Sequence, residues 1–127
     1  MKSKLVLAAL LAAVLPAAAH ADGDVAKGEK VFKKCMACHV HDSTTNKVGP
    51  HLGDVVGRKA ASVEGYKYSD AMIAKGTEGL VWDDASLDQY LADPKGFIPK
   101  NKMVFPGLKK PDERTNVIAF LKSKTGS

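Results

Sequence analysis

The sequence predicts an all-α domain in which three main helices and short helical turns are joined by long loops. Apolar residues recur at steps of three and four near both ends of the chain, as on the buried face of a helix. No segment alternates apolar and polar residues convincingly, as a half-buried strand would. The chain has 127 residues, which is enough for one domain and too few for two.

A first helix is expected to begin after Asp24, whose side chain can accept a hydrogen bond from a free backbone N–H group of the first turn. Its buried stripe is expected to comprise Val25, Gly28, Phe32 and Cys35. Glycine inside a helix costs about 1 kcal/mol relative to alanine, so Gly28 favours a close contact with another helix.

The last helix is expected to begin near Pro111, because proline suits the first helical position. Asp112 and Glu113 follow in the first turn, where negative charge complements the helix dipole. The apolar stripe of this helix comprises Val117, Phe120 and Leu121.

The middle of the chain predicts a third helix from about Asp84 to Ala92, which Pro94 ends. Its inward-facing residues are expected to be Leu87, Tyr90 and Leu91. A shorter helical piece is expected around Ser69 to Ala74. The surface loops are expected to be His41 to Lys47 and Thr77 to Gly79, and His51 is expected to be a surface residue.

The amino terminus has the pattern of a secretory signal peptide. Lys2 and Lys4 precede an apolar run from Leu5 to Leu15, and Ala19-His20-Ala21 resembles a cleavage site. Eleven apolar residues are too few to span a bilayer, which needs about 20. We therefore expect residues 1–21 to be removed and residues 22–127 to form the domain, with a retained membrane anchor as the alternative.

Composition narrows the classes of function. Without residues 1–21, 17 basic residues face 14 acidic ones, and this weak positive charge does not indicate nucleic-acid binding. The whole chain has only eight aromatic residues. Because a chain of this length buries only about 65% of its unfolded surface, a non-protein group can fill the core.

The two cysteines stand in the pentapeptide Cys35-Met36-Ala37-Cys38-His39. A disulfide between them would close too small a loop to constrain the unfolded chain much, and no βαβ pattern indicates a thioredoxin-like motif. A zinc site needs four ligands, and only His41 and His51 remain as candidates. The pattern C-x-x-C-H favours haem attachment, in which each thiol adds to a vinyl group and the histidine lies under the iron, with a redox dithiol as the alternative.

A haem iron with a proximal histidine needs either an open sixth position or a second ligand, which is usually methionine in electron carriers. Met103 lies between Phe97 and Gly107, in a segment interrupted by proline and glycine that predicts an extended apolar loop. Such a loop can present a methionine to the face of the iron opposite His39. The alternative is that Met103 fills a gap in the core, and Met72 is a less favoured rival ligand.

From Gly23 to Lys124 the chain resembles a small soluble class I c-type cytochrome, close to the bacterial cytochrome c2 type and mitochondrial cytochrome c. Besides the pentapeptide, the matching motifs are Gly49-Pro50, Gly57-Arg58-Lys59, Gly65-Tyr66-Lys67-Tyr68-Ser69-Asp70-Ala71, Asp93-Pro94-Lys95, Ile98-Pro99 with Lys102-Met103, and Ile118-Ala119-Phe120-Leu121-Lys122. The resemblance implies a cytochrome c fold wrapped around one covalently attached haem c. It also implies that the first and last helices cross at Gly28.

The same resemblance implies the roles of the site residues. Cys35 and Cys38 would form the thioether bonds, and His39 and Met103 would be the axial iron ligands. The carbonyl of Pro50 would accept a hydrogen bond from His39, and the hydroxyl of Tyr90 would reach the sulfur of Met103. The donors to the haem propionates would be Arg58, Tyr68 and Trp82, together with Asn101, which stands where relatives usually have threonine.

Lysines flank both ligand segments, and the resemblance implies that these segments border the exposed haem edge. We expect them to attract acidic faces of redox partners transiently, with an ordinary solvated surface as the alternative. The lysines are Lys27, Lys30, Lys33 and Lys34 before the attachment motif and Lys95, Lys100, Lys102, Lys109 and Lys110 around Met103.

The resulting hypothesis is a monomeric, non-enzymatic, mono-haem electron carrier of the periplasm that binds no nucleic acid and does not insert stably into a membrane after signal cleavage. It would move single electrons between partners such as a quinol–cytochrome c reductase and a terminal oxidase or photosynthetic reaction centre. The alternatives are a small haem peroxidase or ligand-binding haem protein with a labile methionine, and a thiol oxidoreductase without haem.

Overall fold

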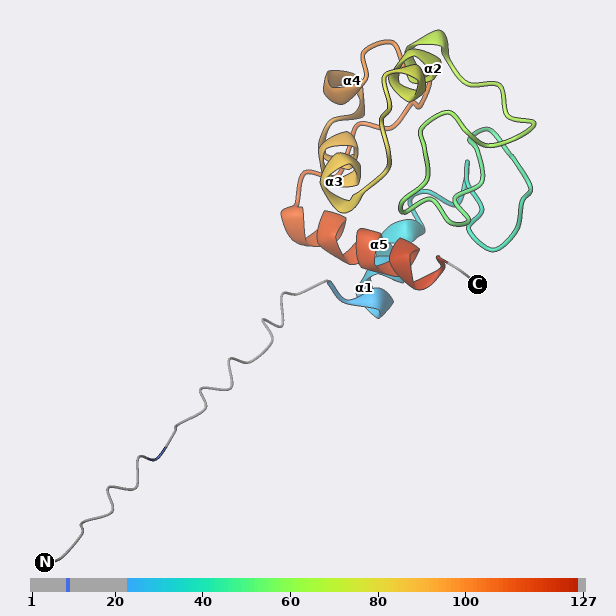
Figure 1. Cartoon of the computed structure of the whole chain (residues 1–127). Coiled ribbons are helices and arrows are strands. Elements are labelled where there is room, and N and C mark those ends of the chain that lie inside the picture. The colour runs from blue at the N-terminus through green and yellow to red at the C-terminus, as the bar shows by residue number, and fades with distance from the viewer. Residues whose placement is uncertain (1–8, 10–22, 126–127) are drawn as a thin grey trace, which may run out of the picture.

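The computed structural model describes residue 9 and residues 23–125. This part of the chain forms five helices, α1 (Val25–Phe32), α2 (Asp70–Thr77), α3 (Asp84–Ala92), α4 (Pro94–Phe97) and α5 (Pro111–Ser123) (Figure 1). It contains no strand, and one isolated antiparallel bridge joins Lys59 to Val81. The predicted all-α class is therefore confirmed, whereas the predicted signal peptide lies outside the described residues. None of the described helices has the length and apolar character needed to cross a membrane.

Helix α1 crosses α5 at Gly28, as the resemblance implies (Figure 1). A methyl group on Gly28 would lie 1.9 Å from the backbone oxygen of Asn116, so only glycine allows the two helices to come this close. Beside the crossing, the rings of Phe32 and Phe120 pack with their centroids 5.3 Å apart. The predicted cap is also present, because the side chain of Asp24 accepts a hydrogen bond from the backbone of α1.

Two details of the predicted α1 stripe are wrong. Val25 is 45% exposed, because the chain ahead of α1 contacts α5 through Gly23 and through the backbone N–H of Asp24 instead. Cys35 lies beyond the end of the helix, in the turns that follow Phe32. These turns, and not the helix itself, carry the attachment motif.

The later helices follow the predicted signals closely. Helix α3 has the predicted bounds and buries Leu87 and Tyr90. Helix α5 has Pro111 at its first position, and it buries the predicted stripe together with the two residues inside it, which are Ile118 and Ala119.

Two short elements differ from the prediction. Pro94 not only ends α3 but also begins α4, a single turn that the side chain of Asp93 caps. Helix α2 is longer than the expected piece from Ser69 to Ala74. Ser69 lies outside the helix as its cap, and the helix continues to Thr77, which was expected in a surface loop. Its extension is stabilised by packing, since Gly76 lies against the backbone of Ala60.

The expectation that His41 and His51 are surface residues is wrong for both. Both residues are half-buried. The imidazole of His41 packs edge-on against the rings of both Phe32 and Phe120, with centroid distances of 5.1 and 5.0 Å, so the three rings form one cluster. The imidazole can pack beside the helix crossing because it is flat and aromatic. The polar character of histidine does not indicate this burial.

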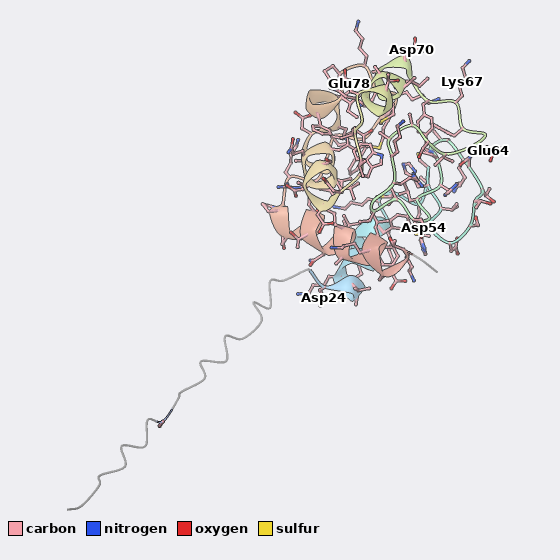
Figure 2. The ribbon with its side chains drawn as sticks, viewed as in Figure 1. Asp24, Asp54, Glu64, Lys67, Asp70 and Glu78 are labelled. Carbon is pink, nitrogen blue, oxygen red and sulfur yellow. The ribbon has the colours of Figure 1, made fainter. Side chains whose placement is uncertain are left out.

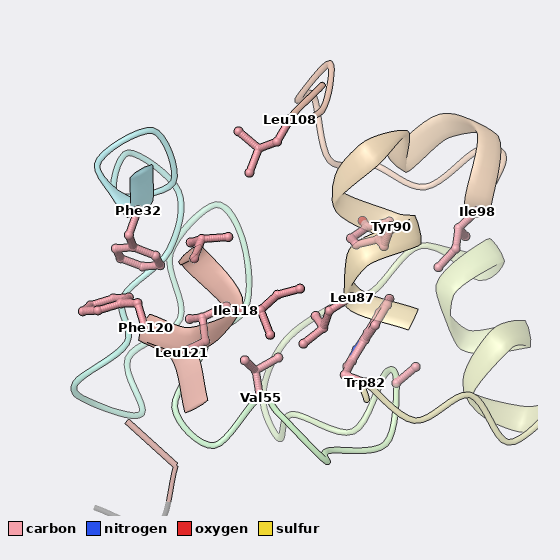
Figure 3. Packing of buried hydrophobic residues seen from close by; sticks show 12 residues of the cluster. Phe32, Val55, Trp82, Leu87, Tyr90, Ile98, Leu108, Ile118, Phe120 and Leu121 are labelled. Carbon is pink, nitrogen blue, oxygen red and sulfur yellow. The ribbon is translucent and has the colours of Figure 1, made fainter. Parts of the chain in front are cut away.

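The buried side chains form one hydrophobic cluster that runs from the α1–α5 crossing to α3 (Figure 3). Phe32 and Phe120 lie at the crossing. Beside α3, Trp82 packs against Tyr90 with ring centroids 5.0 Å apart. Residues from both ends of the cluster line one cavity, so the helices enclose a space as well as a packed core.

Candidate functional site

The described chain surrounds a cavity of about 400 Å³. Most of its lining is apolar and comes from the turns after α1, from α3 and from the loop between α4 and α5. The four residues singled out first by the sequence all line it, although they come from two distant segments: Cys35, Cys38, His39 and Met103. A cavity of this kind suits a mostly apolar ligand with a few polar contacts.

The two cysteines lie in consecutive turns and both are free, with no disulfide between them. The backbone N–H groups of Cys38 and His39 both donate to the carbonyl of Cys35, which holds the motif in a tight turn. Burial raises the pKa of the Cys35 thiol to about 11, so this group is protonated near neutral pH. A protonated Cys35 thiol against an apolar cavity fits addition to a vinyl group better than disulfide exchange, which needs a thiolate.

His39 is held in one orientation by its contact with Pro50. Its Nδ1 atom lies 2.7 Å from the carbonyl oxygen of Pro50 and must donate, because a carbonyl only accepts. The expected hydrogen bond is therefore present, and it leaves the lone pair of Nε2 available to a metal. Burial lowers the pKa of His39, which favours the neutral form that metal binding requires.

Gly49 makes room for the His39 ring. A methyl group at this position would lie 2.3 Å from Cε1 of the imidazole, closer than any real contact. The backbone N–H of Gly49 also donates to the carbonyl of Cys38, so the turn that carries Pro50 is tied directly to the attachment motif.

Met103 lies in the extended loop between α4 and α5 and is half-buried. The hydroxyl of Tyr90 lies 4.0 Å from its sulfur, so this expected contact is present, although the hydroxyl is closer to Oδ1 of Asn101, at 3.3 Å. Met72 lines the same cavity from α2. The cavity therefore receives two methionine side chains, and which of them binds the iron stays a prediction.

Arg58 has an unused donor. Its Nη1 atom donates to the carbonyls of His51 and Gly53, at 3.1 and 3.0 Å. Its Nε atom is buried and has no hydrogen-bond partner among the described residues. Burial lowers the pKa of this guanidinium, and such a group needs an acceptor. A carboxylate such as a haem propionate fits this requirement.

Tyr68 and Trp82 line the cavity near Arg58. The Tyr68 oxygen accepts a hydrogen bond from the backbone of Val63 over 3.0 Å, and burial raises the pKa of the phenol. Its O–H group therefore stays protonated and able to donate. The backbone N–H of Trp82 donates to the carbonyl of Arg58 over 2.8 Å. Trp82 and Arg58, which are two of the expected propionate donors, are therefore held next to each other.

Asn101 does not suit the role of propionate donor that the resemblance implies. Both hydrogens of its amide nitrogen go to backbone carbonyls, those of Pro94 and Ile98. The Asn101 side chain therefore has no N–H group left to donate to a propionate. The sequence could not indicate this, because both carbonyls are backbone groups of neighbouring turns.

The sequence analysis also missed residues that hold the Pro50 turn in place. Asn46 accepts a hydrogen bond from the backbone of His51 and donates to the carbonyl of Glu64, at 3.0 and 3.2 Å. The hydroxyl of Tyr66 donates to the carbonyl of Val48. The quoted motifs include Tyr66, but nothing in the sequence indicates Asn46.

All the predicted docking lysines are exposed. Lys34 and Lys102 line the cavity, and Lys34 also forms an ion pair with Glu113. Acidic side chains such as Glu64, Asp70 and Glu78 are exposed on the outside of the molecule (Figure 2). That the lysines form one continuous docking surface stays a prediction.

The residues around the cavity fit a covalently attached haem. Two free thiols, a neutral imidazole with one available nitrogen, a thioether and an unpartnered buried guanidinium lie around one apolar space. By contrast, no group of three or more His, Cys, Asp or Glu residues in the described chain could hold a bare metal ion, which disfavours the zinc reading.

Known proteins are similar to this chain in both sequence and structure. The family described as cytochrome c matches residues 25–125. Cytochrome c2 of Rhodomicrobium vannielii is 51% identical over 91% of this chain and 90% of its own length. Cytochrome c-554 of Methylosinus trichosporium is 46% identical over 94% of this chain and 89% of its own length.

Solved structures agree with these relatives. Cytochrome cH from Methylobacterium extorquens superposes with a TM-score of 0.74 at 50% identity, covering 80% of this chain and all of its own. Cytochrome c2 from Rhodospirillum centenum gives a TM-score of 0.76 at 41% identity, covering 81% of this chain and 99% of its own.

Proposed function

The chain belongs to the cytochrome c family, and from this premise we propose that it is a periplasmic electron shuttle whose iron is bound by His39 and Met103. It carries one covalently attached haem c and resembles the class I proteins of the c2 type. When bound, the haem supplies an iron that takes up and releases one electron at a time. The remaining chemistry belongs to the side chains around the cavity.

Attachment is proposed to use both cysteines of the pentapeptide. Cys35 and Cys38 would hold the haem through two thioether bonds, each S–H adding across one vinyl double bond so that a C–S bond forms and the hydrogen goes to the neighbouring carbon. The free state of Cys35 and Cys38 and their position at the cavity support this assignment. The carbonyl of Cys35 accepts from the backbone N–H groups of Cys38 and His39, so one tight turn carries all three residues.

The observation that carries the proposal is that His39 and Met103 line one cavity from segments far apart in the sequence. The imidazole nitrogen that does not contact Pro50 is available as a ligand. With His39 and Met103 as ligands, the iron would have no open position, and electron transfer would be favoured over binding of a substrate. Axial methionine also raises the reduction potential relative to ligation by histidine alone.

Arg58, Tyr68 and Trp82 are proposed to receive the propionates. The unpartnered Nε atom of Arg58 supports this role most directly. A positive charge at this place also favours the reduced state, because reduction adds an electron near the guanidinium.

The partners are proposed to be acidic faces of redox proteins, which the monomeric carrier meets transiently. The exposure of the lysines near the attachment motif and near Met103 supports this, because opposite charges speed up encounters without requiring tight binding. A quinol–cytochrome c reductase could act as donor, and a terminal oxidase or photosynthetic reaction centre as acceptor. Residues 1–21 are proposed to export the chain and then to be removed.

Visible absorption of the purified, oxidised holoprotein tests the proposal. We expect a low-spin spectrum with a methionine–ferric charge-transfer band. A high-spin spectrum would instead indicate a peroxidase or ligand-binding protein with an open iron. A colourless protein isolated from the periplasm would contradict haem attachment in this chain.

A further inference from the structure

Asn101 is the one polar or charged residue that is buried in the described chain, with 3% of its surface exposed. It lies in the loop between α4 and α5, two residues before Met103. Burying a side-chain amide is unfavourable unless its hydrogen bonds are all made inside the protein. The partners of this amide therefore indicate why it is there.

All four hydrogen-bonding positions of the Asn101 amide have partners. Its Nδ2 atom donates to the carbonyls of Pro94 and Ile98, at 2.9 and 2.8 Å. Its Oδ1 atom accepts from the backbone N–H of Met103 at 2.9 Å and from the hydroxyl of Tyr90 at 3.3 Å. Exchanging oxygen and nitrogen would place two donors against the Met103 N–H and Tyr90 O–H, so the orientation of the amide is determined.

The backbone of Asn101 is held as well. Its N–H donates to the carbonyl of Ile98 at 3.1 Å, and its carbonyl accepts from Nζ of Lys95 at 2.6 Å. The preceding residue, Lys100, has a φ of +66°, so the chain turns sharply just before the amide enters the core. Asn101 thus joins α3, α4 and the loop of Met103.

We propose that Asn101 is a positioning residue that holds the backbone of Met103 beside the cavity, and that it is not a donor to a propionate. The inference rests on the proposed ligation by Met103. The Met103 N–H has its side-chain acceptor only two residues away, so the backbone of Met103 cannot move away from the cavity without breaking this part-buried hydrogen bond. Breaking this bond would leave the Asn101 amide oxygen with one partner fewer, although all its other hydrogen bonds are made.

Asn101 also affects the hydroxyl of Tyr90. This hydroxyl has one hydrogen and two acceptors, the amide oxygen at 3.3 Å and the Met103 sulfur at 4.0 Å. Because an amide oxygen is the stronger acceptor and is closer, Asn101 draws the hydrogen away from the sulfur. The sulfur then keeps its lone pairs for the metal.

Imidazole binding to the oxidised holoprotein measures how firmly Met103 is held, because added imidazole binds the iron only when the methionine is displaced. We expect Asn101→Ala to increase the apparent imidazole affinity at least tenfold and to weaken the methionine–ferric band. Global unfolding is followed in parallel by far-ultraviolet circular dichroism in denaturant, so that a change at the loop is separated from a change in the whole fold.

Two further variants complete the test. Ile118→Val removes a buried methylene group from α5 at a position that does not line the cavity, and should lower global stability while leaving imidazole affinity within twofold. Asn101→Ser keeps one acceptor for the Met103 N–H but cannot reach both carbonyls, and should give a smaller increase in affinity. Asn101→Ser also tests the inference if the Asn101→Ala variant does not fold.

The inference is overturned if folded Asn101→Ala or Asn101→Ser binds imidazole as the natural sequence does. It is also overturned if affinity rises only in proportion to global stability, as the Ile118→Val control would reveal. A natural-sequence protein without a methionine–ferric band would instead contradict the proposed ligation itself, so the two failures can be told apart.

Discussion

The imidazole of His39 donates a 2.7 Å hydrogen bond from Nδ1 to the carbonyl of Pro50, and Gly49 leaves just enough space for the ring. The bond selects the tautomer and directs Nε2 away from the turn. The ring and the turn therefore depend on each other.

Gly49→Ala should displace His39, because the new methyl group would lie 2.3 Å from the ring. We expect a lower yield of haem-loaded protein and a lower denaturation midpoint. Gly53→Ala is the matched control in the same loop, since its methyl group would meet only ordinary contacts at 3.4 Å or more. Equal losses in the two variants would contradict a special role for Gly49.

Met103→Ala should open the iron, and Met72→Ala should not. The first variant is expected to lose the methionine–ferric band, to bind added imidazole more tightly and to have a lower reduction potential, because the axial thioether is gone. Absorption spectroscopy and a redox titration measure these changes. The opposite pattern, with losses only in Met72→Ala, would identify Met72 as the ligand.

Arg58→Gln should lower the reduction potential by tens of millivolts, because a buried positive charge that favours the reduced state is removed. A shift of about 59 mV corresponds to a tenfold change in a one-electron equilibrium. Arg114→Gln removes the same charge from α5, where Arg114 pairs with Asp88, and should change the potential much less. Equal shifts would mean that Arg58 acts only through the net charge.

Electron transfer to an acidic partner protein should slow as salt is added, because screening weakens attraction between exposed charges. Lys102→Ala, at the edge of the cavity, should reduce the low-salt rate several-fold. Lys75→Ala, where the lysine is paired with Glu78 on α2, should have little effect. Stopped-flow rates that do not depend on ionic strength would contradict the docking proposal.

Gly28→Ala should destabilise the protein although alanine favours helices. A methyl group 1.9 Å from the Asn116 oxygen forces α1 away from α5, and such overpacking costs about 2 kcal/mol. Glu29→Ala, on the exposed side of the same helix, should change stability by less than about 0.5 kcal/mol. Denaturant unfolding compares the two, and a stable Gly28→Ala variant would contradict the tight crossing.

The sequence predicted the longer helices well because their signals are local. A capping aspartate before α1, a proline at the start of α5 and the apolar spacing in α3 each depend on residues within one or two turns. The single turn α4 was missed, since one turn has no periodicity to recognise. The extension of α2 was missed as well, because packing of Gly76 against Ala60 stabilises it.

The pattern from Cys35 to His39 and the loop around Met103 predict the chemistry of the site, because both are recognised from neighbouring residues. Which polar groups already have hydrogen-bond partners is visible only in the folded chain. Asn101 and Arg58 both looked like donors to a propionate, yet the first has no donor left and the second retains one. The reason is physical: a hydrogen bond depends on the position of its partner, and these partners are backbone carbonyls that only folding brings into reach.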